Sequence, residues 1–201
     1  SVLAEKQNKQ TRTHFMTPSV FLLSILPKNL ISYLTGLFVR LRPSKKIADF
    51  LNKNFVSLFK IDMSEAEHPI SSYTSIEGVF TRKLKKGARP ISSSDYCAPC
   101  DGILSLSEEV EKGEDLTLQA KGFSYSVKEL VFGKENKAPK NFTPSFVSTF
   151  YLAPHNYHRV HSPVSGKLVS INHIPGALWP VNPKFLNKVP RLFARNERLV
   201  F

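Results

Sequence analysis

Residues 102–110, "GILSLSEEV", alternate apolar and polar side chains, which is the pattern of a β-strand with one face turned to a core. Residues 115–120, "DLTLQA", repeat this alternation. Two more segments, 145–154 ("SFVSTFYLAP") and 166–174 ("GKLVSINHI"), are strand candidates, and the first of them is rich in β-branched and aromatic residues. Residues 126–132, "SVKELVF", predict a brief helix between the strands. The second half of the chain is therefore expected to be rich in β-structure.

The N-terminal part of the chain has a helical period instead. Residues 18–43, "PSVFLLSILPKNLISYLTGLFVRLRP", carry leucines at alternating spacings of four and three, at Leu30, Leu34, Leu37 and Leu41. A spanning helix needs about 20 mostly apolar residues, and Pro27 and Lys28 interrupt this stretch after a short first half. We therefore do not expect it to span a membrane. Residues 47–59 predict a second amphipathic helix.

Basic side chains are concentrated in the same region. Residues 1–60 hold ten Lys and Arg against two acidic residues, which accounts for eight of the twelve net positive charges. Apolar helix faces edged with cations suit an anionic membrane surface, where each nearby cation contributes about 1 kcal/mol. The other interpretation is that these helices cover an ordinary core. No nucleic-acid partner is expected, because no pattern of arginine and aromatic residues for base stacking accompanies the charges.

These patterns predict an α+β fold, with N-terminal membrane-associating helices followed by a β-rich catalytic domain. Residues 1–62 are expected to form the basic, amphipathic helical region, and residues 63–201 the β-rich domain. A polar linker to about residue 74 and a short helix around 76–82 are expected where the two meet. With 41% hydrophobic and 11% aromatic residues, the chain can bury one sizeable core.

The two cysteines, Cys97 and Cys100, are too few for a disulfide framework, so a reducing compartment fits best. A structural zinc site needs a second pair of ligands, which a lone CxxC does not supply. We interpret both residues as ordinary thiols.

Residues 155–163, "HNYHRVHSP", place three histidines three residues apart, at His155, His158 and His161. Pro154 is expected to start one helical turn over residues 156–160. Each histidine alone fits an ordinary surface position, and HxxHxxH is not a usual spacing for metal ligands, so no metal is expected.

Acid–base chemistry is the third interpretation of these histidines, and it requires a carboxylate that fixes the imidazole tautomer. The candidate is Asp101 in "PCDG", at the start of the first strand, where a loop can present a side chain rigidly. Asp before Gly is also a common turn residue, so this pattern is weak when taken alone.

Five blocks in order resemble the phosphatidylserine decarboxylases. They are "SYTSIEGVFTRKLKKGARPI" (72–91), "APCDGILS" (98–105), "LQAKGFSYSVKELV" (118–131), "YLAPHNYHRVHSPVSG" (151–166) and "LNKVPRLFARNER" (186–198). The resemblance extends from about residue 25 to residue 201, and "YHRVHSP" and "LFARNER" are its most specific parts.

The resemblance implies a carboxy-lyase that converts phosphatidylserine to phosphatidylethanolamine in phospholipid biosynthesis. The proenzyme cuts itself before a serine in a Gly-Ser motif, and that serine becomes a pyruvoyl group on the smaller subunit. No separate cofactor is imported. The pyruvoyl carbonyl then condenses with the amine of the lipid and withdraws electrons as carbon dioxide leaves. The implied location is peripheral, on a bacterial cytoplasmic or mitochondrial inner membrane.

The resemblance also assigns site residues. His161 corresponds to the general base of self-cleavage and Asp101 to the carboxylate that holds its imidazole, since a hydroxyl is a weak nucleophile until a base takes its proton. His158 corresponds to the histidine of the decarboxylation stage. His155 is left as structural. The tasks of Trp179, which fits a lipid-admitting loop or core packing, and of the block Arg195–Arg198 stay open.

No Gly-Ser pair occurs in these 201 residues. The pyruvoyl-forming serine is therefore expected beyond Phe201, and this chain corresponds to the larger-subunit portion of a proenzyme that lacks the cleavage segment. Alone it is expected to be inactive. The alternative is a nonenzymatic basic membrane-binding protein on the same scaffold.

Overall fold

The computed structural model describes residues 25–110, 117–120, 123–133, 139, 142, 146–186 and 188–201. Residues 18–24, the first part of the predicted N-terminal helical stretch, lie outside this description. The helices are α2 (Lys28–Arg40), α3 (Lys45–Phe59), the 3₁₀ helix η1 (Ile70–Ser72), α4 (Ile76–Phe80), α5 (Val127–Phe132), α6 (Pro183–Leu186) and α7 (Leu192–Arg195). The strands are β1 (Ile103–Glu109), β2 (Thr117–Ala120), β3 (Phe123–Ser126), β4 (Phe146–Tyr151), β5 (Asn172–Ile174) and β6 (Arg198–Val200).

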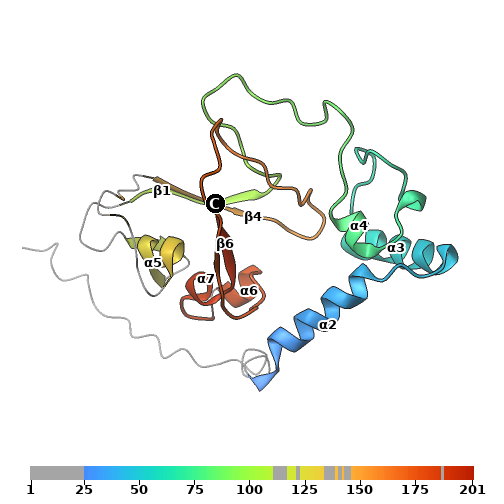
Figure 1. Ribbon diagram of the computed structural model, residues 1–201, viewed down its shortest axis with the longest axis horizontal. Helices are drawn as coiled ribbons and strands as arrows, with labels where there is room; N and C mark the ends of the chain where they lie inside the picture. The colour runs from blue at the N-terminus through green and yellow to red at the C-terminus, as the bar shows by residue number, and fades with distance from the viewer. Residues whose placement is uncertain are drawn as a thin grey trace, which may run out of the picture.

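Helices α2, α3 and α4 lie together at one side of the molecule (Figure 1). Helix α3 ends at Phe59. The next residue, Lys60, has a left-handed backbone (φ 53°), and its N–H bonds to the Val56 and Ser57 carbonyls of the last turn. Helix α4 begins where the Ser75 hydroxyl accepts from the Gly78 N–H at 3.1 Å, and it contacts both α2 and α3. The boundary that we predict at residue 62 thus falls between helices α3 and α4, which are packed together, and it stays a prediction.

The strands form three antiparallel pairs in the described part of the chain: β1 with β4, β2 with β3, and β5 with β6. In the longest pair, Ile103 lies opposite Tyr151 and Glu109 opposite Phe146, with a bulge between Leu104 and Leu106. The mixed helix and strand content confirms the α+β class. The helices expected at 76–82 and 126–132 are also present as α4 and α5.

The strand predicted over residues 166–174 is wrong for most of its length, because only Asn172–Ile174 is a strand. Residues 166–171 are exposed, and in the described structure no other strand pairs with them. Their β-branched and apolar side chains favour a strand only where a neighbouring strand and a covered face are present.

Two small cores hold the β-rich part together. Tyr125 is the centre of one and packs with Val110 and Val127, and Leu192 is the centre of the other. Trp179 belongs to this second core at 6% exposure, which supports core packing over a lipid-admitting loop.

The Arg195–Arg198 block ties these cores to neighbouring segments. The Asn196 side chain both accepts from the backbone N–H of Trp179 at 3.0 Å and donates to its carbonyl at 2.8 Å. The Arg198 guanidinium donates to the carbonyls of Glu129 and Leu130 in α5. These contacts give Asn196 and Arg198 a structural task.

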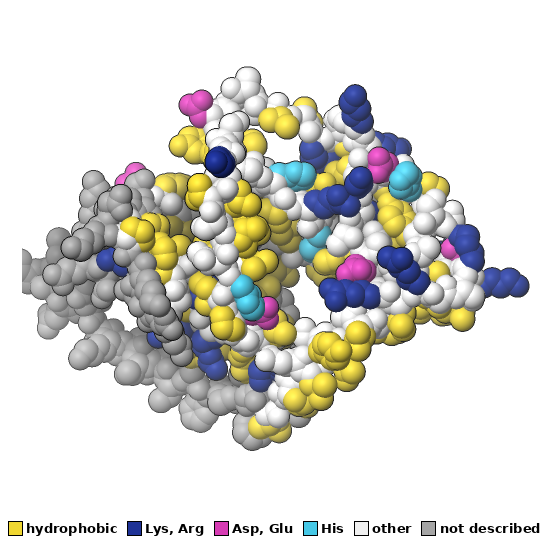
Figure 2. All heavy atoms as spheres, viewed as in Figure 1, with side chains coloured by type: hydrophobic (Ala, Val, Ile, Leu, Met, Phe, Trp, Pro, Cys, Tyr) yellow, Lys and Arg dark blue, Asp and Glu magenta, His cyan; other side chains and the backbone are white. Residues whose placement is uncertain are grey.

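Helix α2 has no buried residue, and its leucine stripe is exposed, with Leu34 at 54%. In the space-filling view, hydrophobic side chains follow this helix along the lower right edge of the molecule (Figure 2). Helix α3 buries only Ala48 and Asn52. Within the described residues, no helix is long and apolar enough to cross a membrane.

Candidate active site

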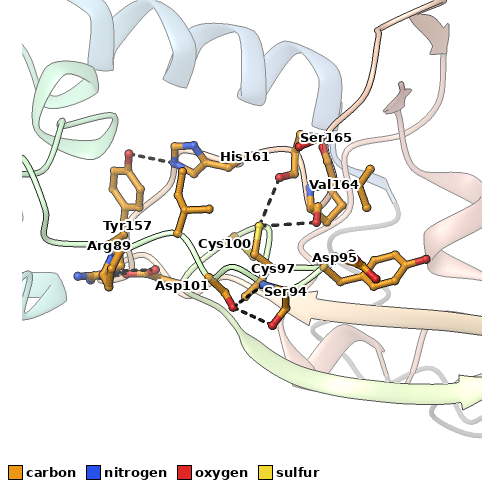
Figure 3. A pocket seen from close by; sticks show the side chains of 17 residues that line it. Arg89, Ser94, Asp95, Cys97, Cys100, Asp101, Tyr157, His161, Val164 and Ser165 are labelled. Atoms are coloured by element: carbon orange, nitrogen blue, oxygen red, sulfur yellow. Dashed lines mark hydrogen bonds and ion pairs between the residues drawn. The ribbon is translucent and has the colours of Figure 1, made fainter.

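A cavity of about 620 Å³ lies between the segment that leads into β1 and the segment that follows β4. Its lining includes Asp101 from the first segment and Tyr157 and His161 from the second (Figure 3). The structure therefore brings Asp101 and His161, sixty residues apart in the chain, to the walls of one cavity.

Backbone hydrogen bonds join the two segments. The His161 N–H donates to the Pro99 carbonyl at 2.8 Å, and the Cys97 N–H donates to the Pro163 carbonyl at 2.9 Å. On the other side of Asp101, a Cβ at Gly102 would lie 3.0 Å from the Tyr151 carbonyl oxygen. Glycine at this position thus lets the start of β1 approach β4 closely, which fixes where Asp101 enters the cavity.

The Asp101 carboxylate binds Arg89 in this structure. The Arg89 Nε lies 3.0 Å from Oδ1 and 2.8 Å from Oδ2 of Asp101, and the same guanidinium forms two bonds of 2.9 Å to the Glu65 carboxylate. Hydrogen bonding to Arg89 lowers the pKa of Glu65, and the two carboxylates together raise the pKa of Arg89. Glu65 and Asp101 therefore share one cation at the edge of the cavity.

The His161 ring stacks on Tyr157, with the ring centroids 5.7 Å apart, and its Nε2 lies 3.3 Å from the Tyr157 hydroxyl oxygen. Tyr157 is buried, so this contact gives the exposed imidazole a fixed support. No hydrogen bond joins the described side chains of Asp101 and His161 directly. Their shared role in self-cleavage stays a prediction.

His158 is placed differently from His161, because its side chain does not line this cavity. Its ring packs on Phe80 of α4 with centroids 3.8 Å apart, and its Nδ1 lies 2.9 Å from the Asn156 carbonyl oxygen. Burial lowers the pKa of His158, since the charged imidazolium loses water. Its role in decarboxylation is untested.

The helical turn predicted over residues 156–160 is wrong. The Asn156 N–H and side chain close a tight turn onto Ala153, and residues 157–160 are not helical. The reason lies in Arg82, whose guanidinium takes the carbonyls of His155 and Asn156 at 3.2 and 3.5 Å. In a helix these carbonyls would point along the axis towards the N–H groups of residues 159 and 160, so the bonds to Arg82 favour the open loop.

Cys97 and Cys100 are free thiols near the cavity, and the Cys97 Sγ lies 3.7 Å from the Ser162 carbonyl oxygen. Burial raises the pKa of Cys100. In the described part of the chain, no three His, Cys, Asp or Glu side chains are grouped so that they could hold a metal ion.

Comparison with known proteins identifies the family. The sequence model described as phosphatidylserine decarboxylase matches residues 76–201, which is more than half of the chain and includes both walls of the cavity. The chain belongs to the phosphatidylserine decarboxylase family. This confirms the resemblance carried by the five sequence blocks.

Three relatives give the extent of the similarity, and each is named phosphatidylserine decarboxylase proenzyme. The chain is 44% identical to the protein of Legionella pneumophila (strain Corby) over 87% of its own length and 61% of the relative. It is 41% identical to the protein of Dechloromonas aromatica (strain RCB) over 88% of its own length and 61% of the relative. It is 42% identical to the protein of Idiomarina loihiensis over 90% of its own length and 62% of the relative. The chain thus spans about three fifths of the length of these decarboxylase relatives.

Sequence reasoning missed Arg82, Arg89, Glu65 and Tyr157. Both arginines lie in the decarboxylase block at 72–91, but a charged residue there is more often solvent-exposed than buried. Arg82 is 4% exposed, and its Nε has no partner in the described structure. Arg159 makes a second link of this kind, with its Nε 2.9 Å from the Thr81 carbonyl oxygen. Together, Arg82 and Arg159 attach the end of α4 to residues 155–161, the loop that carries the three histidines.

Replacing Arg82 by alanine is expected to lower the free energy of unfolding by about 2–4 kcal/mol, because two carbonyls lose charged donors and a cavity remains. Burial lowers the pKa of Arg82, so the buried charge also carries a cost. Arg82→Met fills most of the space and removes that cost, so a loss less than half as large is expected. Urea unfolding followed by circular dichroism measures both variants. Equal losses would contradict this account of Arg82.

Proposed function

We propose that the full-length protein decarboxylates phosphatidylserine to phosphatidylethanolamine by way of a self-generated pyruvoyl group. The observation that carries the proposal is the position of Asp101 and His161, which come from two separate family blocks and line one cavity. The names of the relatives and the family match support the substrate and the proenzyme character. Self-cleavage on a denaturing gel, together with release of carbon dioxide from phosphatidylserine vesicles, tests the proposal.

In the proposed self-cleavage, His161 takes the proton of a serine hydroxyl and Asp101 orients the imidazole. The serine would come from sequence outside these 201 residues, in the part that becomes the smaller subunit. The exposed His161 imidazole faces the cavity and can reach an incoming hydroxyl, while Tyr157 supports its ring from one side. An uncut wild-type protein would rule out this function and favour the nonenzymatic membrane-binding alternative.

The cavity also suits the pyruvoyl group that the family implies. It has room for a small carbonyl group, and its walls offer the Tyr157 hydroxyl and the His161 imidazole as hydrogen-bonding partners. When formed, the pyruvoyl group supplies an electron-withdrawing carbonyl for the amine of the lipid. Tyr157 and His161 of this chain would hold that group by hydrogen bonds.

His158 is our candidate for moving a proton in the decarboxylation stage. The Asn156 carbonyl can only accept, so it fixes the proton on Nδ1 and leaves Nε2 as the basic nitrogen. The lowered pKa keeps the ring neutral at neutral pH, so Nε2 could take up a proton from the ammonium group of the lipid and return it to the α-carbon after carbon dioxide leaves. His158 comes three residues before His161, but its ring packs on Phe80 rather than lining the cavity, so its role rests on the family resemblance.

We also propose that α2 and α3 bind the surface of an anionic membrane, which would make the protein a peripheral membrane protein. The leucine stripe of α2 is exposed, and so are Ile47, Phe50 and Leu58 of α3. Lys45, Lys46 and Lys53 of α3 supply cations beside these apolar side chains. Apolar area and positive charge act together in this mode of binding.

Leu34→Glu is expected to reduce binding to anionic vesicles by about tenfold or more, because inserting a leucine side chain is worth about 1.5–3 kcal/mol. Ser32→Glu is the matched control, since it adds the same charge on the opposite face of α2. Flotation with vesicles at low and high salt measures binding. Equal binding by Leu34→Glu and wild type would contradict the membrane role of this face.

A further inference from the structure

Arg89 lies on the cavity wall, and the family resemblance assigns it no role. Its guanidinium contacts two carboxylates that are 36 residues apart in the chain, Glu65 and Asp101. We propose that Arg89 is a positioning residue for self-cleavage: it aims Asp101 into the cavity, while Glu65 cancels its charge so that Asp101 can still stabilise a protonated His161. This inference rests on the proposed function of Asp101 and His161.

The geometry of the bonds from the Arg89 guanidinium to Glu65 and Asp101 supports this role. Two guanidinium nitrogens bind the two oxygens of Glu65 at 2.9 Å each, while the Nε edge binds both oxygens of Asp101 at 3.0 and 2.8 Å. Bonds of this kind between guanidinium and carboxylate are directional as well as strong. The Asp101 carboxyl group is thereby held in one orientation, which a turn residue before glycine would otherwise lack.

Backbone contacts hold the Arg89 support in place. The Glu65 carbonyl accepts from the Lys85 N–H at 2.8 Å, and the Ala88 N–H donates to the Lys85 carbonyl at 3.1 Å. Gly87, at φ 82°, permits the tight turn between them. Glu65 and Arg89 therefore belong to one small bridged unit, and Asp101 is held against that unit.

The charges of the three groups explain why Glu65 is needed. One cation between two carboxylates leaves a net charge of minus one. This charge can favour the protonated form of His161, which lines the same cavity. Arg89 and Asp101 alone would form a neutral pair and support that charge less. Glu65 and Asp101 without Arg89 would repel each other.

The Arg89 bonds still leave Asp101 able to hold His161. An ionised carboxylate has about four lone-pair sites, so an imidazole N–H can add to the bonds from Arg89. Arg89 has no contact with His161 itself among the described interactions. It therefore acts through Asp101, which makes it a positioning residue.

The test measures the rate of self-cleavage of the full-length protein against pH. Arg89→Gln is expected to cleave about 10–100-fold more slowly, as is common when a supporting residue behind a functional group is lost. Arg89→Lys keeps the positive charge but loses the planar set of donors that binds two carboxylates at once, and an intermediate rate is expected. Glu65→Gln is expected to move the acid limb of the profile to lower pH, because the carboxylates bound to Arg89 lose one negative charge and support a cation in the cavity less.

The double variant Arg89→Gln/Glu65→Gln separates this role from a merely structural one. It removes the repulsion that Arg89→Gln leaves between the two carboxylates, so it is expected to cleave faster than Arg89→Gln alone. Arg191→Gln is the matched control, because it removes an exposed guanidinium that is paired with Glu129 and does not line the cavity. It is expected to cleave like the wild type.

Wild-type rates in Arg89→Gln, or an unmoved pH profile in Glu65→Gln, would overturn the inference while leaving the proposed function intact. An uncut wild type would overturn the proposed function and this inference with it. Melting temperatures show whether each variant folds. If Arg89→Gln does not fold, the pH profile of Glu65→Gln tests the inference instead: a shifted acid limb supports it and an unmoved one overturns it.

Discussion

His161→Ala in the full-length protein is expected to leave the proenzyme uncut, with self-cleavage slowed by about 10⁴-fold or more. The serine hydroxyl would lose the base that takes its proton, and groups that act as one catalytic unit lose most of their effect when any member is removed. Asp101→Asn is expected to give a loss of about the same size, because an amide favours the wrong imidazole tautomer. Time courses on a denaturing gel measure both rates.

His155→Ala is the control for this experiment. His155 lies on the same loop, but it is exposed, and Arg82 binds its backbone carbonyl rather than its ring. The alanine variant keeps that carbonyl, and it is therefore expected to cleave like the wild type. Cleavage that neither the His161 nor the Asp101 change affects would refute both role assignments.

His158→Ala is expected to separate the two stages of the reaction. Self-cleavage should continue, because His158 does not line the cavity that holds Asp101 and His161. Decarboxylation by the cleaved protein should fall by about 10²–10⁴-fold, the usual contribution of a positioned acid–base group. The measurements are the gel assay and carbon dioxide release on the same preparation.

The pH dependence of decarboxylation gives a second readout for His158. Burial lowers the pKa of His158, so the neutral ring persists below the ordinary histidine pKa of 6.5. Wild-type activity should therefore hold as pH falls through 6.5 and be lost only at lower pH, when the ring becomes protonated. His158→Ala should show a low rate without this acid limb. If His158→Ala shows the same loss of activity at low pH as the wild type, that loss comes from another titrating group.

The local patterns of the sequence predicted those elements whose neighbours reinforce them. The alternation in 102–110 corresponds to β1, which is paired with β4 along its length. The core-facing side expected for this strand is wrong, because every residue of β1 except the half-buried Leu106 is exposed. Residues 166–171 have similar composition but no strand partner in the described structure, so propensity alone did not produce a strand. The loop after Pro154 departs from its predicted helical turn because of Arg82, more than seventy residues earlier in the chain.

The candidate site was predictable only in part. Family blocks pointed to Asp101 and His161, and the fold brings those blocks to one cavity. The support around them was not visible in the sequence, because Glu65, Arg89 and Asp101 share no local spacing. Ion pairs between distant segments depend on the tertiary fold, which no helical or strand period encodes.

A double-mutant cycle on self-cleavage tests most directly whether Asp101 and His161 act on the same proton. The rates needed are those of the wild type, Asp101→Asn, His161→Ala and the double variant, all in the full-length protein. If the two side chains work as a pair, the double variant should cleave no more slowly than His161→Ala alone. Losses that multiply in the double variant would show two independent groups and contradict the pairing.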